Sequence, residues 1–128
     1  MIKFGLKKIE SIHSKQQFDQ LEIDGIGILD LFEKVLKGTT YQSEFKVMLT
    51  YMEYLGNSGL LPETKFKNIT PVKESVSEYE FKSKHLRMYA IQKTGGKIIV
   101  LGGFKNTQKK DIIRFRAIKK AYLIALKY

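Results

Sequence analysis

Two short segments of this 128-residue chain collect the side chains that could do chemistry on a phosphate group. The first is Lys82-Ser83-Lys84-His85-Leu86-Arg87, which carries three cations and a histidine. The second runs from Gly102 to Ile112 and holds Lys105, Lys109 and Lys110. An arginine can grip a phosphate with two parallel hydrogen bonds, whereas a lysine acts as a point charge. These residue types therefore favour a polyanion as the ligand.

The strand pattern predicts that the two segments come together. A tight connection between two β-prone runs contains the first segment, and the apolar strand Lys97–Phe104 follows the hairpin loop Thr94–Gly96. In an antiparallel sheet, Arg87 then faces the strand that delivers Lys105. Both cations could converge on one phosphate. Two solvated strand ends would explain the same residues.

Charge is distributed very unevenly along the chain. Residues 1–81 hold 10 basic and 12 acidic groups, whereas residues 82–128 hold 13 basic groups and a single acid, Asp111. The net charge of +12 in the second part repels itself, and a phosphate backbone would relieve that repulsion while releasing its own counterions. A solvated basic face kept for solubility is the alternative. We favour the polyanion, because the same segment is apolar enough to fold.

Other kinds of site find little support in the sequence. The chain has no cysteine, which excludes disulfides, thiolate metal sites and a cysteine nucleophile. His13 and His85 are the only histidines and have no cluster of ligands around them, so neither a metal nor a cofactor is expected. Asp111 fits the first turn of a helix better than a catalytic base. His85 could move a proton near neutral pH, or it is a loop histidine without a role.

The apolar periodicity predicts three helices in one α+β domain that covers residues 1–128. Helical spacing runs from Ile28 to Leu36, where Gly38 follows as a stop signal, and again from Phe45 to Leu55. A third helix, with one apolar face and many basic residues, closes the chain from Asp111 to Tyr128.

Strands are expected before and between these helices. Three consecutive strands are predicted at 79–81, 86–92 and 97–104, the last in the middle of the sheet because it is apolar on both faces. The leading strand lies near 2–12 or 18–23. We expect a small antiparallel sheet with the two N-terminal helices packed on one face, together with the C-terminal helix. The other face would be left open, with basic residues near it.

The chain shows no segment suited to a membrane. Lysines interrupt its N-terminus, and the apolar run Ile98–Leu101 is far too short to cross a bilayer. A cytoplasmic protein without a membrane partner is therefore expected.

The strands and the last helix resemble the RelE/HigB/ParE superfamily of toxins from toxin–antitoxin pairs. The residues that carry the resemblance are Glu80-Phe81-Lys82, Leu86-Arg87-Met88-Tyr89 and the run from Ile98 to Ile112. The family's usual pattern is an acidic-apolar-Arg strand, an Arg-bearing strand, and an apolar strand that runs into Lys-x-x-Gln-Lys. The order of elements also agrees from about Ile26 onward.

In the RelE and HigB branches, this resemblance implies a ribosome-dependent endoribonuclease that cuts translated mRNA without a metal. The ribose 2′-hydroxyl attacks the neighbouring phosphate, and cationic side chains stabilise the developing charge. By position, the resemblance makes Lys82, Arg87 and Lys105 the catalytic cations. The residues expected to bind RNA or the ribosome are Lys84, His85, Lys109, Lys110 and Tyr128, the last by stacking on a base.

Three departures from the family pattern keep other functions open. Lys82 stands where the family has Arg, which loses bidentate recognition of phosphate. Asn106 stands where a second Lys is common. The Gly102-Gly103 form of the motif is closest to members described only as addiction-module killer proteins. A ParE-like inhibitor of DNA gyrase and a non-catalytic basic nucleic-acid-binding module are the alternatives. A toxin also implies an acidic antitoxin, encoded nearby, that covers the basic surface.

Overall fold

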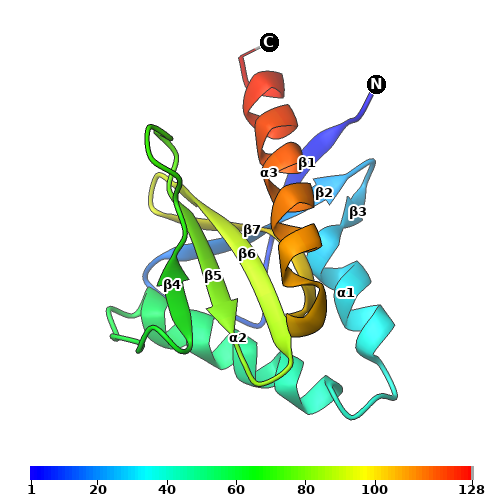
Figure 1. Cartoon of the computed structure of the whole chain (residues 1–128), viewed down its shortest axis with the longest axis vertical. Helices are drawn as coiled ribbons and strands as arrows, with labels where there is room; N and C mark the ends of the chain where they lie inside the picture. Colours follow the sequence, from blue (N-terminus) through cyan, green and yellow to red (C-terminus); the bar gives the residue numbers. More distant parts are fainter. Residues whose placement is uncertain (128) are drawn as a thin grey trace.

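The computed structural model describes residues 1–127 and shows a mixed β-sheet with helices on both faces (Figure 1). The α+β class predicted from the sequence is confirmed. Seven strands and three α-helices are formed in the described residues, with a 3₁₀ turn before the last helix. The elements in chain order are β1 Phe4–Lys8, β2 Gln17–Ile23, β3 Ile26–Gly27, α1 Ile28–Leu36, α2 Gln42–Gly56, β4 Phe66–Asn68, β5 Glu78–Lys82, β6 Leu86–Lys93, β7 Gly96–Phe104, η1 Lys105–Thr107 and α3 Gln108–Ala125.

The strand order is β1-β2-β7-β6-β5-β4, and the short β3 pairs with β2 outside this path. Neighbouring strands are antiparallel except β2 and β7, which pair in parallel from Gln17 opposite Gly96 to Gln20 opposite Ile99. The expectation of a small antiparallel sheet is therefore wrong. Both candidate leading segments form strands, and β2 docks on the free edge of β7 while the chain runs in the same direction in each.

The two faces of the sheet are covered by different helices. The first two helices cover one face, where Phe32, Phe45 and Met48 join a buried core with Phe81, Met88 and Ile99. On the other face, α3 buries Phe115 and Tyr122 against a second core that includes Tyr89. The rings of Tyr89 and Phe115 stack with 5.4 Å between their centroids. The expected open face is thus closed, because the apolar side of α3 packs directly onto it.

The prediction of α1 from apolar spacing is confirmed at both ends, and its start has an unusual partner. The N-cap residue Gly27 offers no side-chain cap. Instead, Gln20 on β2 uses its Oε1 atom to accept the backbone N–H groups of Leu29, at 3.1 Å, and Asp30, at 3.0 Å. This amide satisfies two donors that the first turn of a helix leaves without partners, so the sheet fixes where α1 begins.

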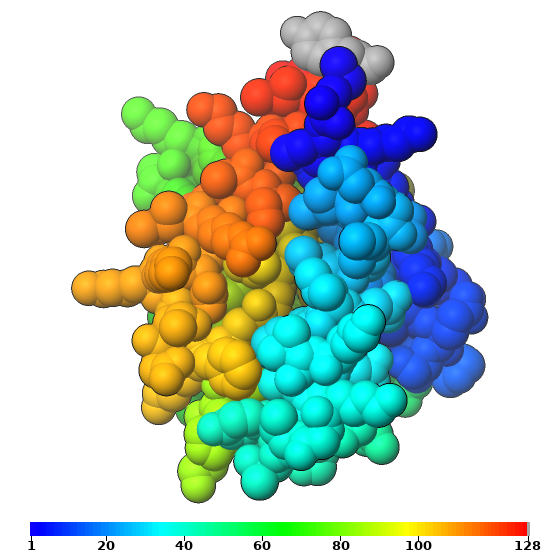
Figure 2. Space-filling model, turned by 90° about the vertical axis from the view of Figure 1, so that its right-hand side faces the viewer, coloured from blue at the N-terminus to red at the C-terminus, as the bar shows by residue number. Residues whose placement is uncertain are grey.

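The paired glycines Gly102 and Gly103 let two helices approach β7 closely. A Cβ atom on Gly102 would overlap the ring of Phe32 on α1, and one on Gly103 would overlap the carboxylate of Asp111 on α3. Figure 2 shows α1 and α3 side by side on one surface of the molecule, with part of β7 between them. The glycines therefore serve helix packing here.

Candidate nucleic-acid interface

One end of the sheet gathers most of the residues selected from the sequence. The residues Ser83–His85, called the β5–β6 loop below, connect the two strands at the lower end of the sheet in Figure 1. Lys82 is the direct cross-strand partner of Arg87. The backbone N–H of Lys105 donates to the carbonyl oxygen of His85 at 2.8 Å. Strand pairing thus brings Lys82, Arg87 and Lys105 to the same end of the sheet.

The lysines at this end differ in how freely a ligand can reach them. Lys84 and Lys105 are exposed, and Lys82 is half-buried. Lys109 and Lys110 are exposed in the first turn of α3, which follows Lys105 after the η1 turn. Within residues 1–127, none of the five is engaged in an ion pair. Tyr128, the predicted stacking residue, lies outside the described residues.

Arg87 is buried and donates hydrogen bonds to the main chain next to it. The residue is 7% exposed. Its Nη1 atom donates to the carbonyl oxygens of Ser83, at 2.7 Å, and Leu86, at 2.8 Å, while its Nε has no partner in the described part of the chain. Hydrogen bonds from a charged donor are among the strong ones in proteins. The guanidinium therefore links the start of the β5–β6 loop to the first residue of β6.

A carboxylate from α2 holds the same loop from the opposite side. Glu44 accepts hydrogen bonds from the Ser83 hydroxyl and from the backbone N–H groups of His85 and Leu86. Its Oε2 atom lies 3.0 Å from Nδ1 of the His85 ring. Burial works to raise the pKa of Glu44, but the hydrogen bonds from Ser83 and His85 together hold that pKa below its ordinary value. An ionised Glu44 therefore fixes both the loop and the orientation of the imidazole.

A pocket of about 320 Å³ opens beside this histidine. It is lined by Tyr41, His85, Phe104, Lys105 and Asn106, and is called the aromatic pocket below. The Tyr41 ring centroid lies 5.2 Å from that of His85 and 5.6 Å from that of Phe104. Flat aromatic walls next to a lysine suit a nucleobase that carries a phosphate, because bases stack on aromatic rings and phosphates attract cations.

Sequence reasoning missed Tyr41 and Glu44. Both lie at the start of α2, about 40 positions before the loop that they contact, and the apolar spacing of α2 says nothing about its polar side. The only available signal was an acidic residue in the first turn of a helix, which is common for reasons unrelated to function.

The surface charge is smaller than the sequence count of cations suggests. Lys119 is buried and pairs with Glu78 and Glu74, and Arg116 pairs with Glu78 as well. Lys93 pairs with the buried Asp19. These cations from residues 82–128 neutralise acids from residues 1–81. The available positive charge therefore concentrates at the β5–β6 loop and along the exposed side of α3.

Lys97 is a buried cation without an acidic partner in the described residues. It is 6% exposed, and its Nζ atom donates to Oε1 of Gln16 at 3.0 Å. The same atom lies 5.1 Å from the ring centroid of Tyr79 and 6.0 Å from those of Phe18 and Phe66. The rings favour the charged form, but burial outweighs them and lowers the pKa of Lys97.

Replacing Lys97 by methionine is expected to raise the free energy of unfolding at pH 7 by about 1 kcal/mol, because a buried cation is exchanged for an apolar chain of similar size. In the wild type, the folded chain holds this proton less tightly than the unfolded chain. Stability should therefore rise as pH increases from the lowered pKa towards the ordinary value of 10.5, and the variant should lose that rise.

Urea unfolding of both proteins at pH 7 and pH 10 measures this effect. Lys67→Met is the matched control, because Lys67 is exposed on the edge strand β4. A variant at position 97 that is less stable than the wild type at pH 7 would show that the three rings and Gln16 compensate for the burial.

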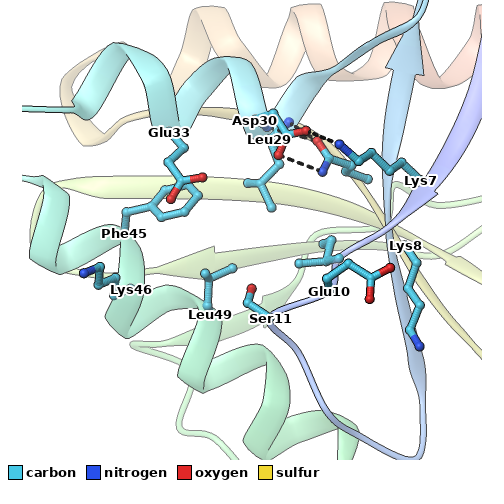
Figure 3. A pocket seen from close by; sticks show the side chains of 12 residues that line it. Lys7, Lys8, Glu10, Ser11, Leu29, Asp30, Glu33, Phe45, Lys46 and Leu49 are labelled. Carbon is cyan, nitrogen blue, oxygen red and sulfur yellow. Dashed lines mark hydrogen bonds and ion pairs between the residues drawn. The ribbon is translucent and has the colours of Figure 1, made fainter.

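A second pocket, of about 490 Å³, lies between the start of the chain and the first two helices. Figure 3 shows Leu29, Phe45 and Leu49 along its wall, with charged side chains of both signs around them. Lys7 is not free here, because its Nζ pairs with Asp30 at 2.9 Å and Gln20 also donates to that carboxylate. Two further acids, Glu10 and Glu33, line the pocket, which makes it less suited to a polyanion than the aromatic pocket.

Two further findings bear on the kind of site. None of the helices formed by residues 1–127 is long and apolar enough to cross a membrane. In the same residues, no group of three or more His, Asp and Glu side chains is placed to hold a metal ion.

No family model, no curated protein and no solved structure matches the chain significantly.

Proposed function

We propose that the protein is the toxin of a toxin–antitoxin pair, with a RelE-like domain, and that it cleaves translated mRNA on the ribosome without a metal. The observation that carries this proposal is the end of the sheet where exposed lysines, a carboxylate-bound histidine and an aromatic pocket lie together. The helices α1 and α2 on one face of the sheet, followed by the β5–β6–β7 meander and α3, support the proposal, although β1 to β3 precede them and β2 pairs with β7 in parallel.

In the proposed reaction, the 2′-hydroxyl of one nucleotide attacks the adjacent phosphate. The new bond joins the 2′-oxygen to phosphorus, and the bond from phosphorus to the 5′-oxygen of the next nucleotide breaks. Lys82, Arg87 and Lys105 supply positive charge where the phosphate gains negative charge. Lys84, Lys109 and Lys110 hold the flanking backbone of mRNA or ribosomal RNA. The cytoplasm is the compartment in which this substrate occurs.

Lys105 is the best residue for a first test, because it is exposed and lines the aromatic pocket. The purified protein is incubated with ribosomes that translate a defined mRNA, and new 5′ ends are mapped by primer extension. We expect cuts with the wild type and a rate reduced roughly tenfold to a hundredfold in Lys105→Ala, since one cation is lost from the transition state. Lys3→Ala removes the same charge outside the basic segment 82–128, so this control should cut at the wild-type rate.

Wild-type protein that leaves translated mRNA intact would refute the nuclease. Inhibition of DNA gyrase by the same preparation would then favour the ParE-like function. Binding of RNA and DNA without either activity would favour a basic binding module, in which each lysine variant loses affinity by a similar small factor. An acidic partner encoded beside the gene is expected for a toxin, and its absence would count against both toxic functions.

A further inference from the structure

The hydrogen bond between His85 and Glu44 gives the imidazole a defined protonation pattern. A carboxylate can only accept, so Nδ1 of the neutral ring carries the hydrogen that faces Oε2 of Glu44, 3.0 Å away. The Nε2 atom then holds a free lone pair. The side chain is 47% exposed, and the ring lines the aromatic pocket. The structure thus presents a group that can accept a proton beside a pocket of nucleotide size.

Two side chains from packed elements restrain the surrounding loop. Glu44 binds the loop and the first residue of β6 through one hydroxyl and two backbone N–H groups, and Arg87 binds one carbonyl oxygen of each. These contacts arise from α2 and β6, which belong to the packed part of the molecule. They fix the position of His85 relative to Phe104 and Lys105, whose own backbone N–H is bonded to the His85 carbonyl. A fixed donor–acceptor geometry is what proton transfer to a bound substrate requires.

We propose that His85 is the catalytic residue that takes the proton of the attacking 2′-hydroxyl, that Glu44 is its positioning residue, and that the aromatic pocket holds the base of that nucleotide. This assignment rests on the proposed nuclease function. Tyr41 and Phe104 contact each other edge to face, with 5.6 Å between their centroids, so the base would stack on the free side of the Tyr41 ring. That position would leave its ribose at the pocket mouth, near His85. Lys105, on the pocket rim, would then face the phosphate.

The step balances as a transphosphorylation. The 2′-hydroxyl gives its proton to Nε2 of His85 while its oxygen bonds to phosphorus, and the departing 5′-oxygen takes a proton from water. The resulting hydroxide removes the proton from His85. The products are a 2′,3′-cyclic phosphate and a 5′-hydroxyl end.

The proton-transfer role is tested with His85→Ala in the ribosome cleavage assay, with and without added imidazole. We expect the cleavage rate to fall roughly 100-fold to 10,000-fold and imidazole to restore part of it, because a free imidazole can occupy the space that the side chain leaves. Lys105→Ala, which removes a charge and no base, should not respond to imidazole. Glu44→Gln should lower kcat with little change in KM, as expected for a positioning residue. Circular dichroism melts establish that each variant is folded.

The pocket is tested separately, with a 2′-O-methyl-RNA tetranucleotide that binds but cannot be cut. Fluorescence anisotropy should show binding by the wild type and by His85→Ala, and binding weakened about tenfold in Tyr41→Ala because one stacking surface is lost. Tyr54→Ala is the matched control, since Tyr54 is an exposed tyrosine nearer the other end of α2.

The possible outcomes separate the two proposals. Cleavage at the wild-type rate by His85→Ala would overturn the assignment of His85 and leave the nuclease function intact. Wild-type protein that cuts no mRNA would overturn the nuclease and the proton transfer together, and the tetranucleotide would still decide the pocket. Equal affinity of Tyr41→Ala and wild type for the tetranucleotide would overturn the aromatic pocket as a base-binding site.

Discussion

Replacing Lys119 by alanine is expected to lower the free energy of unfolding by about 3 kcal/mol, at the low end of the range for breaking a buried ion pair. Lys119 is 2% exposed and Glu78 is 1% exposed. The Nζ atom lies 2.8 Å from Oε2 of Glu78 and 2.8 Å from the carbonyl oxygen of Val76. The loss of this cation leaves a buried carboxylate with fewer partners. Arg116 still donates to Glu78 at 2.9 Å, which is why the expected cost is not larger.

Thermal unfolding measures the effect, and a drop of roughly 10 °C in the midpoint is expected for a domain of this size. Lys120→Ala is the control, because Lys120 is the exposed neighbour of Lys119 on the same helix, and its removal should change stability by less than about 0.5 kcal/mol. A double variant with Lys119→Met and Glu78→Leu should recover most of the loss, since it removes both charges at once. Equal melting points for Lys119→Ala and Lys120→Ala would contradict the buried ion pair.

Under the proposed nuclease function, Arg87→Ala is expected to lower the rate of mRNA cleavage roughly 100-fold to 1,000-fold, the usual effect of removing a donor from a charge-stabilising site. The structure gives this loss two sources. The guanidinium supplies positive charge at the end of the sheet where Lys82 and Lys105 lie, and it also bonds two carbonyl oxygens of the β5–β6 region. The second role means that the variant should also be less stable, by about 1–3 kcal/mol, because hydrogen bonds from a charged group are lost.

Hydrogen exchange at the amides of Ser83 to Leu86 distinguishes the two sources. Faster exchange together with slow cleavage identifies Arg87 as a positioning residue that acts through the loop and His85. Unchanged exchange with slow cleavage identifies a direct contact with the phosphate. Arg87→Lys keeps the charge but not the planar fork, so it should remain slow in either case. Cleavage by Arg87→Ala at the wild-type rate would remove Arg87 from the site altogether.

Local patterns predicted most of the helices and the strand meander. Apolar spacing places α1 at its observed bounds, and Thr94-Gly95 forms the turn between β6 and β7, with Gly95 at a φ of +78°. The central position of β7 followed from its continuous apolar run, and the structure places it between β2 and β6. These features depend on residues close in the sequence, which is why a single sequence reveals them.

The N-terminal strands show what the pattern could not decide. The segments near 2–12 and 18–23 looked like competing candidates for one leading strand, yet the strands β1 and β2 that form there pair with each other. Asp24 and Gly25, both at positive φ, form the turn into β3, and an Asp-Gly pair between apolar residues is a strong hairpin signal that the prediction did not use. The parallel pairing of β2 with β7 joins positions almost 80 residues apart, and no local pattern encodes it.

The candidate site likewise has one part that local patterns predict and one part that depends on distant contacts. The placement of Lys82, Arg87 and Lys105 at one end of the sheet followed from the pairing of strands within one meander. The contribution of α2 through Tyr41 and Glu44, and the burial of Lys119 by Glu78, depend on packing between distant segments. Basic residues on α3 all look solvent-facing in the sequence, and only the fold separates Lys119 from Lys120.

The parallel contact between β2 and β7 also sets an order for folding during synthesis. The β5–β6–β7 meander and α3 form from residues close in sequence, whereas β2 must wait for β7 before its edge can be paired. Contacts between distant segments close large loops and slow folding. The β1–β2–β3 unit therefore remains without its docking edge until residue 99 has left the ribosome. Because the β5–β6 loop, Lys105 and the start of α3 also follow the first two helices along the chain, the cationic end of the sheet is complete only after Lys110 has left the ribosome.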